Sequence, residues 1–503
     1  MLPISLMAEI IPNYEILTIE IPLNNITSLE DVDIEIPVCK YNKDFALTFT
    51  GDDALMGIYQ RAFNYVHANY IDNTDIFHDY GKPVTTGFTP KRKLVTTDGC
   101  GNDKPFRLCV NWFSCEPGKT MHTNGNIYTP QMWWSEGEKF TDFHNGILNH
   151  GGAYEKEDPK KSIDFNFDEI KENLGINAFI LGVPGGSTGF PDEAEINTNV
   201  YFMEAANFAS GASNNTVNLS KLSKDNILKT RSPRICVDTK DHTFINEIID
   251  SKSVKDGWIN LFCHNIKNSE AKVNGQINAD TCYNMLDYIY DNYGKGGKDN
   301  VWFASSSEIL EYQYSRLNSE IIKEVVDNKL KITIKAAILS GFYFNELSLN
   351  MSGIKDCSDI YFSDNIFGYS LACEANKAIV NLNYSERDIK LTEKYIEKVK
   401  SDNNEKSISE AMYFISNLRP ELKEEYLKKL NQITSLSSLN DDNDSYFVFD
   451  GKKIIVSAQL KSSFTIYNID GSVFKTIDAI NSDQYIELPK GLYLLRQKKL
   501  MVY

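Results

Sequence analysis

A short apolar run that ends in two adjacent aspartates constrains the fold of this chain more than any other feature. The run covers residues 45–50 and is nearly continuous, which suits a strand buried on both faces of a parallel sheet. It ends at Gly51-Asp52-Asp53, and helical periodicity follows over residues 54–69. A strand, an acidic turn and a helix begin an α/β unit, in which functional groups gather where the strands end.

The same alternation continues along the next 250 residues or so. Strands are expected at residues 106–113, 178–183, 258–263 and 301–304, helices at 165–174 and 279–293, and partly helical character at 198–209. This order of elements predicts an α/β fold, a distorted (β/α) barrel over residues 41–316.

The remaining segments predict accessory domains, and 503 residues are too many for a single core. Period-two alternation at residues 15–21 and 33–36 predicts two strands within residues 1–40, which we expect to lead into the barrel. After the barrel we expect all-β accessory domains with a short helical segment. They are a β-sandwich module at residues 328–386, a Lys/Glu-rich helical segment at 391–433, and a small β domain at 446–503 with a hairpin turn at 468–472.

Charge and composition exclude several classes of function. The net charge of −17 argues against nucleic acid and anionic membranes as partners, because both would be repelled. No apolar run reaches the roughly 18 residues of a membrane-spanning helix, and the apolar start lacks the basic residues of a secretion signal, so no leader is visible. The nine cysteines contain no C-x-x-C pair. The close group Cys100, Cys109 and Cys115 is interpreted as sparse buried thiols rather than a disulfide or soft metal site.

Four side chains are candidates for chemistry, and three of them lie at the ends of predicted strands. Asp52 and Asp53 suit a site in which one carboxylate binds a metal and the other acts as base; the alternative is a helix N-cap with a solvated neighbour. His150 lies in an Asn-His-Gly-Gly turn that would expose a zinc ligand, and His264 ends a strand where a general acid could sit. Either histidine could instead be a hydrogen-bonded structural residue.

These residues resemble the motifs of NodB-type polysaccharide deacetylases, carbohydrate esterase family four. Residues 48–53 are similar to the Thr-Phe-Asp-Asp-Gly motif with two residues inserted, Asn149-His150 resembles the start of the His-x-x-x-His motif, and residues 261–265 resemble the final Leu-x-x-His-Asp motif. Trp302 and residues 305–316 also resemble the corresponding segments of multi-domain, Bacteroidetes-like bacterial members that carry accessory domains. The resemblance implies that Asp52 is the general base, that Asp53 and His150 bind the metal, and that His264 is the general acid.

The chain departs from the family pattern at three places. Tyr154 stands where the second histidine ligand is expected, residues 182–186 lack the arginine of the third motif, and Asn265 replaces a closing aspartate. The implied cofactor is a divalent metal, zinc first, which normally takes three protein ligands and one water. The third ligand is left open among Tyr154, Glu155 and His144.

The activity implied by the resemblance is metal-dependent hydrolysis that removes acetyl groups from a polysaccharide or oligosaccharide, with an acetylated glycan as substrate. Trp133 and Trp134 are candidates for stacking on sugars, although tryptophans also fill cores, and Pro184 and Gly185 lie at the third motif. The missing histidine favours an alternative, a catalytically impaired glycan-binding protein on the same fold. In a third possibility the barrel is a scaffold for the C-terminal β domains.

The C-terminal module carries a second resemblance. Residues 464–472, together with residues 488–493, resemble the sorting domains of type IX secretion substrates. This resemblance implies an extracytoplasmic protein, located in the periplasm, on the cell surface or outside the cell.

Overall fold

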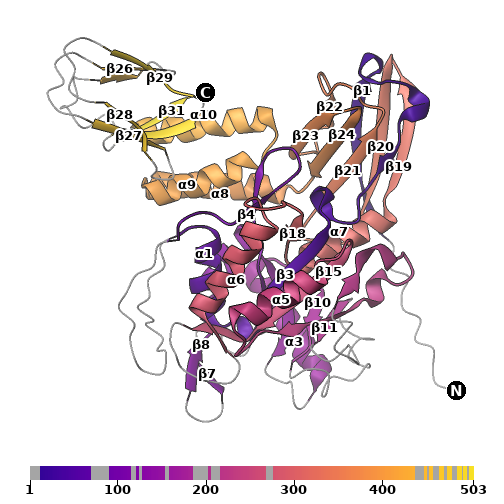
Figure 1. The fold of residues 1–503 in the computed structure, drawn as a ribbon, viewed down its shortest axis with the longest axis vertical. Coiled ribbons are helices and arrows are strands. Elements are labelled where there is room, and N and C mark those ends of the chain that lie inside the picture. Colours follow the sequence, from indigo (N-terminus) through magenta and orange to yellow (C-terminus); the bar gives the residue numbers. More distant parts are fainter. Residues whose placement is uncertain are drawn as a thin grey trace. The chain divides into compact units, whose positions relative to one another are not determined.

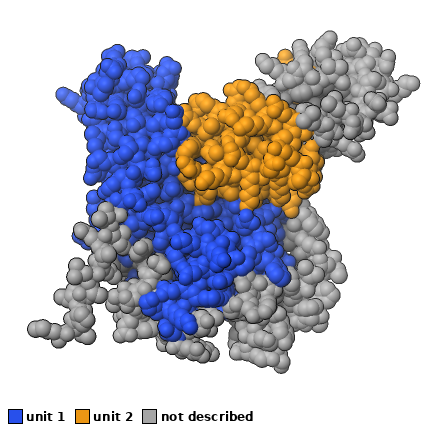
Figure 2. Space-filling model, turned by 180° about the vertical axis from the view of Figure 1, so that it is seen from behind, with its two compact units in different colours: residues 1–366, 370–384 blue, residues 367–369, 385–503 orange. Residues whose placement is uncertain are grey.

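The structure is a computed structural model, and it divides into two compact units (Figure 2). It describes residues 12–69, 90–114, 120–123, 127–152, 158–184, 202–205, 216–267 and 276–436, and most of the strand residues between 447 and 502. The first unit comprises residues 1–366 and 370–384, and it contains a barrel and a β module. The second unit comprises residues 367–369 and 385–503.

A ten-stranded, largely parallel sheet forms the barrel (Figure 1). Its main path runs through β15 (Gly257–Cys263), β3 (Phe45–Gly51), β6 (Cys109–Ser114), β9 (Gly146–Gly152), β10 (Ile180–Gly182), β11 (Phe202–Ala205) and β13 (Arg231–Pro233). After Arg234 the chain continues into β14 (Ile235–Cys236), which pairs with β15. Because β13 pairs with β11 and β14 pairs with β15, this one segment nearly closes the sheet.

Burial explains which strands the sequence could predict. Strands β3 and β15 are buried along their whole length and pair in parallel, so their apolar runs carry a clear signal. The strands expected at 45–50 and 258–263 are therefore confirmed. The partly helical character expected at 198–209 is wrong for residues 202–205, which form β11. A four-residue strand buried on both faces has no period-two pattern to distinguish it from a helix.

The predicted alternation is completed by helices and by two edge strands. Strand β12 (Val217–Asn218) pairs with β15, and β18 (Val301–Phe303) pairs with β3. Among the described residues, the longer barrel helices are α2 (Trp134–Asp142), α3 (Pro159–Leu174), α5 (His242–Lys252), α6 (Ala279–Asn292) and α7 (Ser306–Asn318). Side chains cap four of these helices by accepting a backbone N–H of the first turn: Asp158, Asp241, Asn278 and Ser305.

Two four-stranded sheets form the β module of the first unit. One has the order β19 (Glu320–Val326), β20 (Lys329–Ile338), β1 (Asn13–Pro22) and β22 (Tyr361–Phe362). The other has the order β2 (Ile34–Glu35), β21 (Glu346–Ser352), β24 (Lys377–Asn383) and β23 (Gly368–Glu374). The chain passes from β2 into β3 of the barrel, but β1 and β2 themselves pair with β20 and β21 of the β module. A period-two pattern shows that one face of a strand is buried, and it does not identify the partner strand.

The cysteines of the first unit differ in state. Cys357 and Cys373 form a disulfide in the β module. Of the group singled out in the sequence, Cys109 is a buried free thiol, Cys100 is a partly exposed free thiol, and Cys115 lies outside the described residues.

Helix α7 joins the barrel to the β module and is buried although its sequence is polar. Its Glu308 forms ion pairs with Lys40 at 2.7 Å and with Arg107 at 2.9 Å. Lys40 also forms an ion pair with Glu346 in β21. All four side chains are buried. Burial lowers the pKa of Lys40, but Glu308 and Glu346 outweigh it, so the net pKa is raised and the ammonium stays charged.

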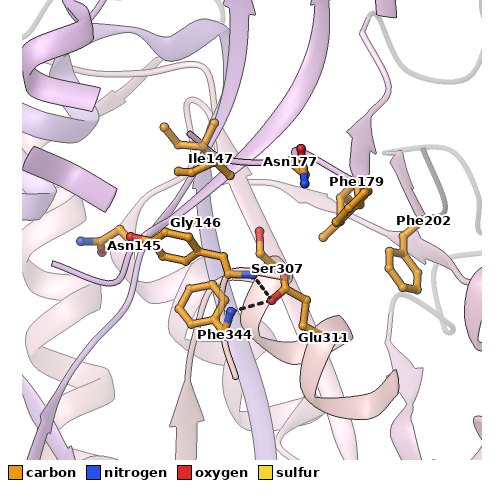
Figure 3. Close-up of a pocket in the computed structure, with 12 residues that line it drawn as sticks. Asn145, Gly146, Ile147, Asn177, Phe179, Phe202, Ser307, Glu311 and Phe344 are labelled. Atoms are coloured by element: carbon orange, nitrogen blue, oxygen red, sulfur yellow. Dashed lines mark hydrogen bonds between the residues drawn. The ribbon is translucent and has the colours of Figure 1, made fainter. Parts of the chain in front are cut away.

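A small pocket lies at the same junction (Figure 3). Glu311 of α7 accepts the backbone N–H groups of Tyr343 and Phe344 at 2.8 and 2.7 Å beside it. The pocket has room for about one water molecule and is lined by Gly146, Ile180 and Phe202, the first residues of β9, β10 and β11. It therefore lies at the amino ends of these strands and is too small for a substrate.

Among its described residues, the second unit has three helices and small sheets. Helices α8 (Arg387–Ser401), α9 (Glu405–Ser416) and α10 (Pro420–Leu436) pack together where helical spacing predicts them. Strands β27 (Phe464–Asn468) and β28 (Val473–Ile477) pair antiparallel, in agreement with the hairpin predicted there. Across the described residues, no helix combines the length and apolar character that crossing a membrane requires.

Replacing Lys40 with methionine tests the buried ion cluster. The substitution removes the charge and leaves two buried carboxylates with Arg107 as their remaining cation, so the free energy of unfolding should fall by about 3–5 kcal/mol. Chemical denaturation measures this change. Lys331→Met is the matched control, because it breaks the exposed pair with Glu324 and should cost less than about 1 kcal/mol. Equal losses in the two variants would contradict a stabilising role for the cluster.

Candidate active site

The carboxyl ends of the parallel strands bring all four predicted catalytic or metal-binding residues together. Asp52 and Asp53 follow β3, His150 lies in the second half of β9, and His264 follows β15. Asp53 is close to His150, and both histidines contribute to the electrostatics of Asp52. The parallel arrangement places these strand ends at one edge of the barrel, where ligand sites of α/β barrels form.

Asp52 is buried in an ion pair inside the barrel. Its Oδ1 accepts Nδ2 of Asn111 and a guanidinium nitrogen of Arg234, each at 2.6 Å, and the residue is 2% exposed. Burial raises the pKa of Asp52, but Arg234 and, to a smaller extent, His150 outweigh it, so the net pKa lies below the usual range. The carboxylate is therefore ionised near neutral pH, and it does not serve as the helix N-cap that the sequence left open.

Arg234 is the partner that the sequence analysis missed. Its guanidinium carbon lies 4.2 Å from the ring centroid of Phe262. Burial lowers the pKa of Arg234, but Asp52 and the buried Glu204 of β11 raise it overall, so the side chain stays charged. The third motif lacks its arginine in the sequence, yet the barrel supplies one to Asp52 from the segment that closes the sheet.

The sequence of residues 234–238 does carry the alternation of polar and apolar residues that is typical of a strand. Arg234, Cys236 and Asp238 alternate with the apolar Ile235 and Val237. Alternate residues of a strand point to the same face, so the pattern places three polar side chains on one side. The strand is too short to stand out without knowledge of its neighbours.

Gly182 of the third motif acts through its backbone. A Cβ atom at this position would lie 2.2–2.4 Å from the side-chain amide of Asn111, so only glycine lets Asn111 reach Asp52. The carbonyl oxygen of Gly182 also hydrogen-bonds Nδ1 of His150. This contact orients the imidazole and leaves Nε2 to face Asp53.

Asp53 and His150 have the separation of two ligands of one metal ion. The backbone of Asp53 is left-handed, with φ 62° and ψ 13°, and its Oδ1 lies 3.4 Å from Nε2 of His150. Ligand atoms on a tetrahedral zinc ion lie about 3.3–3.6 Å apart, so the donor pair fits such an ion. Burial lowers the pKa of His150, whereas Asp52 and Asp53 raise it, and the net pKa is raised.

The structure narrows the choice of a third ligand. Tyr154 and Glu155 lie outside the described residues. His144 is excluded as the third ligand, because it precedes β9 whereas His150 is in the second half of that strand. Six extended residues span about 20 Å, which is too far for both side chains to bind one ion. His144 contributes instead to the electrostatics of Glu346, in the cluster at the junction with the β module.

His264 is oriented by a carboxylate that the sequence analysis did not identify. Its Nδ1 lies 2.5 Å from Oδ2 of Asp238, and its backbone N–H donates to Oδ1 of the same residue at 3.2 Å. The hydrogen bond to Asp238 raises the pKa of His264 to about 9. A protonated imidazole whose side chain is 44% exposed suits a general acid.

The predicted substrate-binding residues have different environments. Trp133 is 50% exposed, and Gln131, two residues before it, donates to the backbone carbonyl of Asp53 at 2.9 Å. Trp134 stacks on the buried Trp112 with ring centroids 4.6 Å apart, which is the core-filling role. Of the residues at the third motif, Pro184 is buried just after β10 and Gly185 lies outside the described residues.

Replacing Asp238 with asparagine should lower the pKa of His264. In the folded protein the pKa of His264 is raised above its ordinary value of 6.5. The contact between His264 and Asp238 therefore stabilises the protein fully below pH 6.5 and loses its effect as the pH rises through about 9. NMR titration of labelled histidines, with His264→Gln to assign the signal, measures the value. Asp241→Asn, which alters only the cap of α5, should leave it unchanged. A pKa of His264 near 6.5 in the unmodified protein would contradict the pairing of this residue with Asp238.

Comparison with known proteins supports a class of protein for this chain. Residues 235–432 match a family model described as "Putative polysaccharide deacetylase". The matched range starts in the closing segment of the barrel, so it includes Asp238 and His264, and it ends in α10. A comparison with curated proteins found no match. The family match therefore supports a polysaccharide deacetylase, and so a hydrolase, as the class of this protein.

Proposed function

We propose that this protein is a metal-dependent deacetylase that hydrolyses the acetyl groups of an N- or O-acetylated glycan. The observation that carries the proposal is that an ionised carboxylate and a protonated imidazole lie at one edge of the barrel. Arg234 holds Asp52 ionised, while Asp238 holds His264 protonated. Hydrolysis of an amide or ester needs a base for the attacking water and an acid for the leaving group. The family match supports the same chemistry.

Asp53 and His150 would hold a divalent metal, with zinc as the first candidate and Tyr154 as a further ligand. Their donor atoms are of the types that zinc prefers, and their 3.4 Å separation fits. When bound, such a metal acidifies a water molecule and polarises the substrate carbonyl. The backbone turns left-handed at Asp53, directly after Asp52, which would let one carboxylate serve the metal and the other the proton.

The proton transfers are assigned to residues of this chain. Asp52 accepts the proton of the attacking water, since its low pKa keeps it ionised at neutral pH. Asn111 and Arg234 keep its position fixed through two hydrogen bonds. His264 donates a proton to the leaving amine or hydroxyl, and the adjacent Asp238 keeps the imidazole oriented throughout. The products are acetate and the deacetylated glycan.

A glycan-binding protein without catalysis is the second candidate. Tyr154 in place of a histidine ligand favours it, as does the exposed Trp133, whose flat ring suits a sugar face. Binding alone would not require a buried carboxylate held ionised beside a histidine held protonated. The two ion pairs therefore favour the enzyme.

We also propose an extracytoplasmic location. The disulfide between Cys357 and Cys373 supports it, because disulfides persist in oxidising compartments. The resemblance of the C-terminal module to secretion sorting domains points the same way.

Acetate release tests the proposed activity. Zinc-loaded protein is incubated with N-acetylated chitooligosaccharides and with O-acetylated xylan, and acetate is quantified. Asp52→Asn keeps an acceptor but removes the base, so kcat should fall by about 10²- to 10⁴-fold, and His264→Gln should lower it in the same range. Asp241→Asn serves as control and should retain the full rate. Tight glycan binding by the unmodified protein without any acetate release would instead support the binding function.

A further inference from the structure

A second group of side chains of metal-ligand types includes His264, whose pKa Asp53 also raises. Among the described residues, Cys236, Asp238 and His264 bring a thiol, a carboxylate oxygen and an imidazole nitrogen within 4.8 Å of one another. We propose that these three residues form a separate site for a thiophilic divalent cation such as zinc. Its donor set of sulfur, nitrogen and oxygen is one that zinc accepts, and the partly exposed location leaves room for water as a fourth ligand.

The strands determine the geometry of this three-residue site. Cys236 and Asp238 are two residues apart and face the same side, and β14 pairs in register with β15, with Cys236 opposite Phe262, two residues before His264. Sγ of Cys236 lies 3.3 Å from Oδ2 of Asp238, close to the spacing of ligands on one zinc ion. The 2.5 Å contact between His264 and Asp238 would have to open by roughly 1 Å, which an exposed imidazole can do by rotating.

Metal binding at this site releases two protons, one from Cys236 and one from His264. The metal forms bonds to Sγ of Cys236 and Nδ1 of His264, and the thiol and the imidazolium each release one proton to water. Metal uptake should therefore increase with pH. If the proposed function is correct, the imidazole that remains keeps its Nε2 proton but is no longer an imidazolium, so it is a weaker general acid, and this site would make the deacetylase sensitive to excess zinc.

Cobalt binding tests the site without reference to activity. The full-length Asp53→Ala/His150→Ala variant lacks the ligands proposed for the catalytic metal, and it is titrated with Co²⁺. We expect about one Co²⁺ per chain with a thiolate-to-cobalt charge-transfer absorption, which is lost when Cys236→Ser is added. Cys100→Ser, which removes another partly exposed thiol, is the control and should leave the absorption intact.

Two results would overturn the proposal. One is a folded double variant that takes up no Co²⁺ with a thiolate absorption, and the other is an absorption that Cys236→Ser leaves unchanged. If circular dichroism shows that the double variant is unfolded, the same titration is decisive on the unmodified chain, since Asp53 and His150 supply no sulfur. A protein without deacetylase activity would still pass or fail this binding test, so the two proposals are separable.

Discussion

The buried ion pair between Arg234 and Asp52 is the interaction on which the site depends. A carboxyl group as buried as that of Asp52 would normally bind a proton, and the guanidinium prevents this. Arg234 lies between β13 and β14, where the sheet nearly closes, so the segment that nearly closes the barrel also supplies the cation that keeps the proposed base ionised. Removing one member of such a pair leaves an uncompensated buried charge.

One short segment contacts both residues to which the proposed proton transfers are assigned. Arg234 contacts Asp52, and Asp238, four residues later on the same face, contacts His264. The first contact lowers the pKa of a carboxylate, and the second raises the pKa of an imidazole. Cys236 lies between them and near Asp238, which is why the same face also offers a thiol to a metal.

The sequence predicts the residues that lie at the ends of long apolar strands. It does not predict the side chains and strands that pair with them. Asp52, Asp53 and His264 follow buried strands whose apolar runs are easy to read, and His150 precedes a glycine turn. Arg234 is 182 residues from Asp52, and the two short strands that flank it, β13 and β14, have no length or apolar run to mark them. The pairing of β1 with β20 is hidden for the same reason, since strand partners are chosen by tertiary packing.

The metal proposed at Asp53 and His150 decides whether the two ion pairs serve hydrolysis. Crystals grown with zinc and measured at the zinc absorption edge would locate it by anomalous scattering. We predict a peak within about 2.2 Å of both Oδ1 of Asp53 and Nε2 of His150. Well-diffracting crystals that contain zinc but show no peak between these two atoms would contradict the deacetylase mechanism.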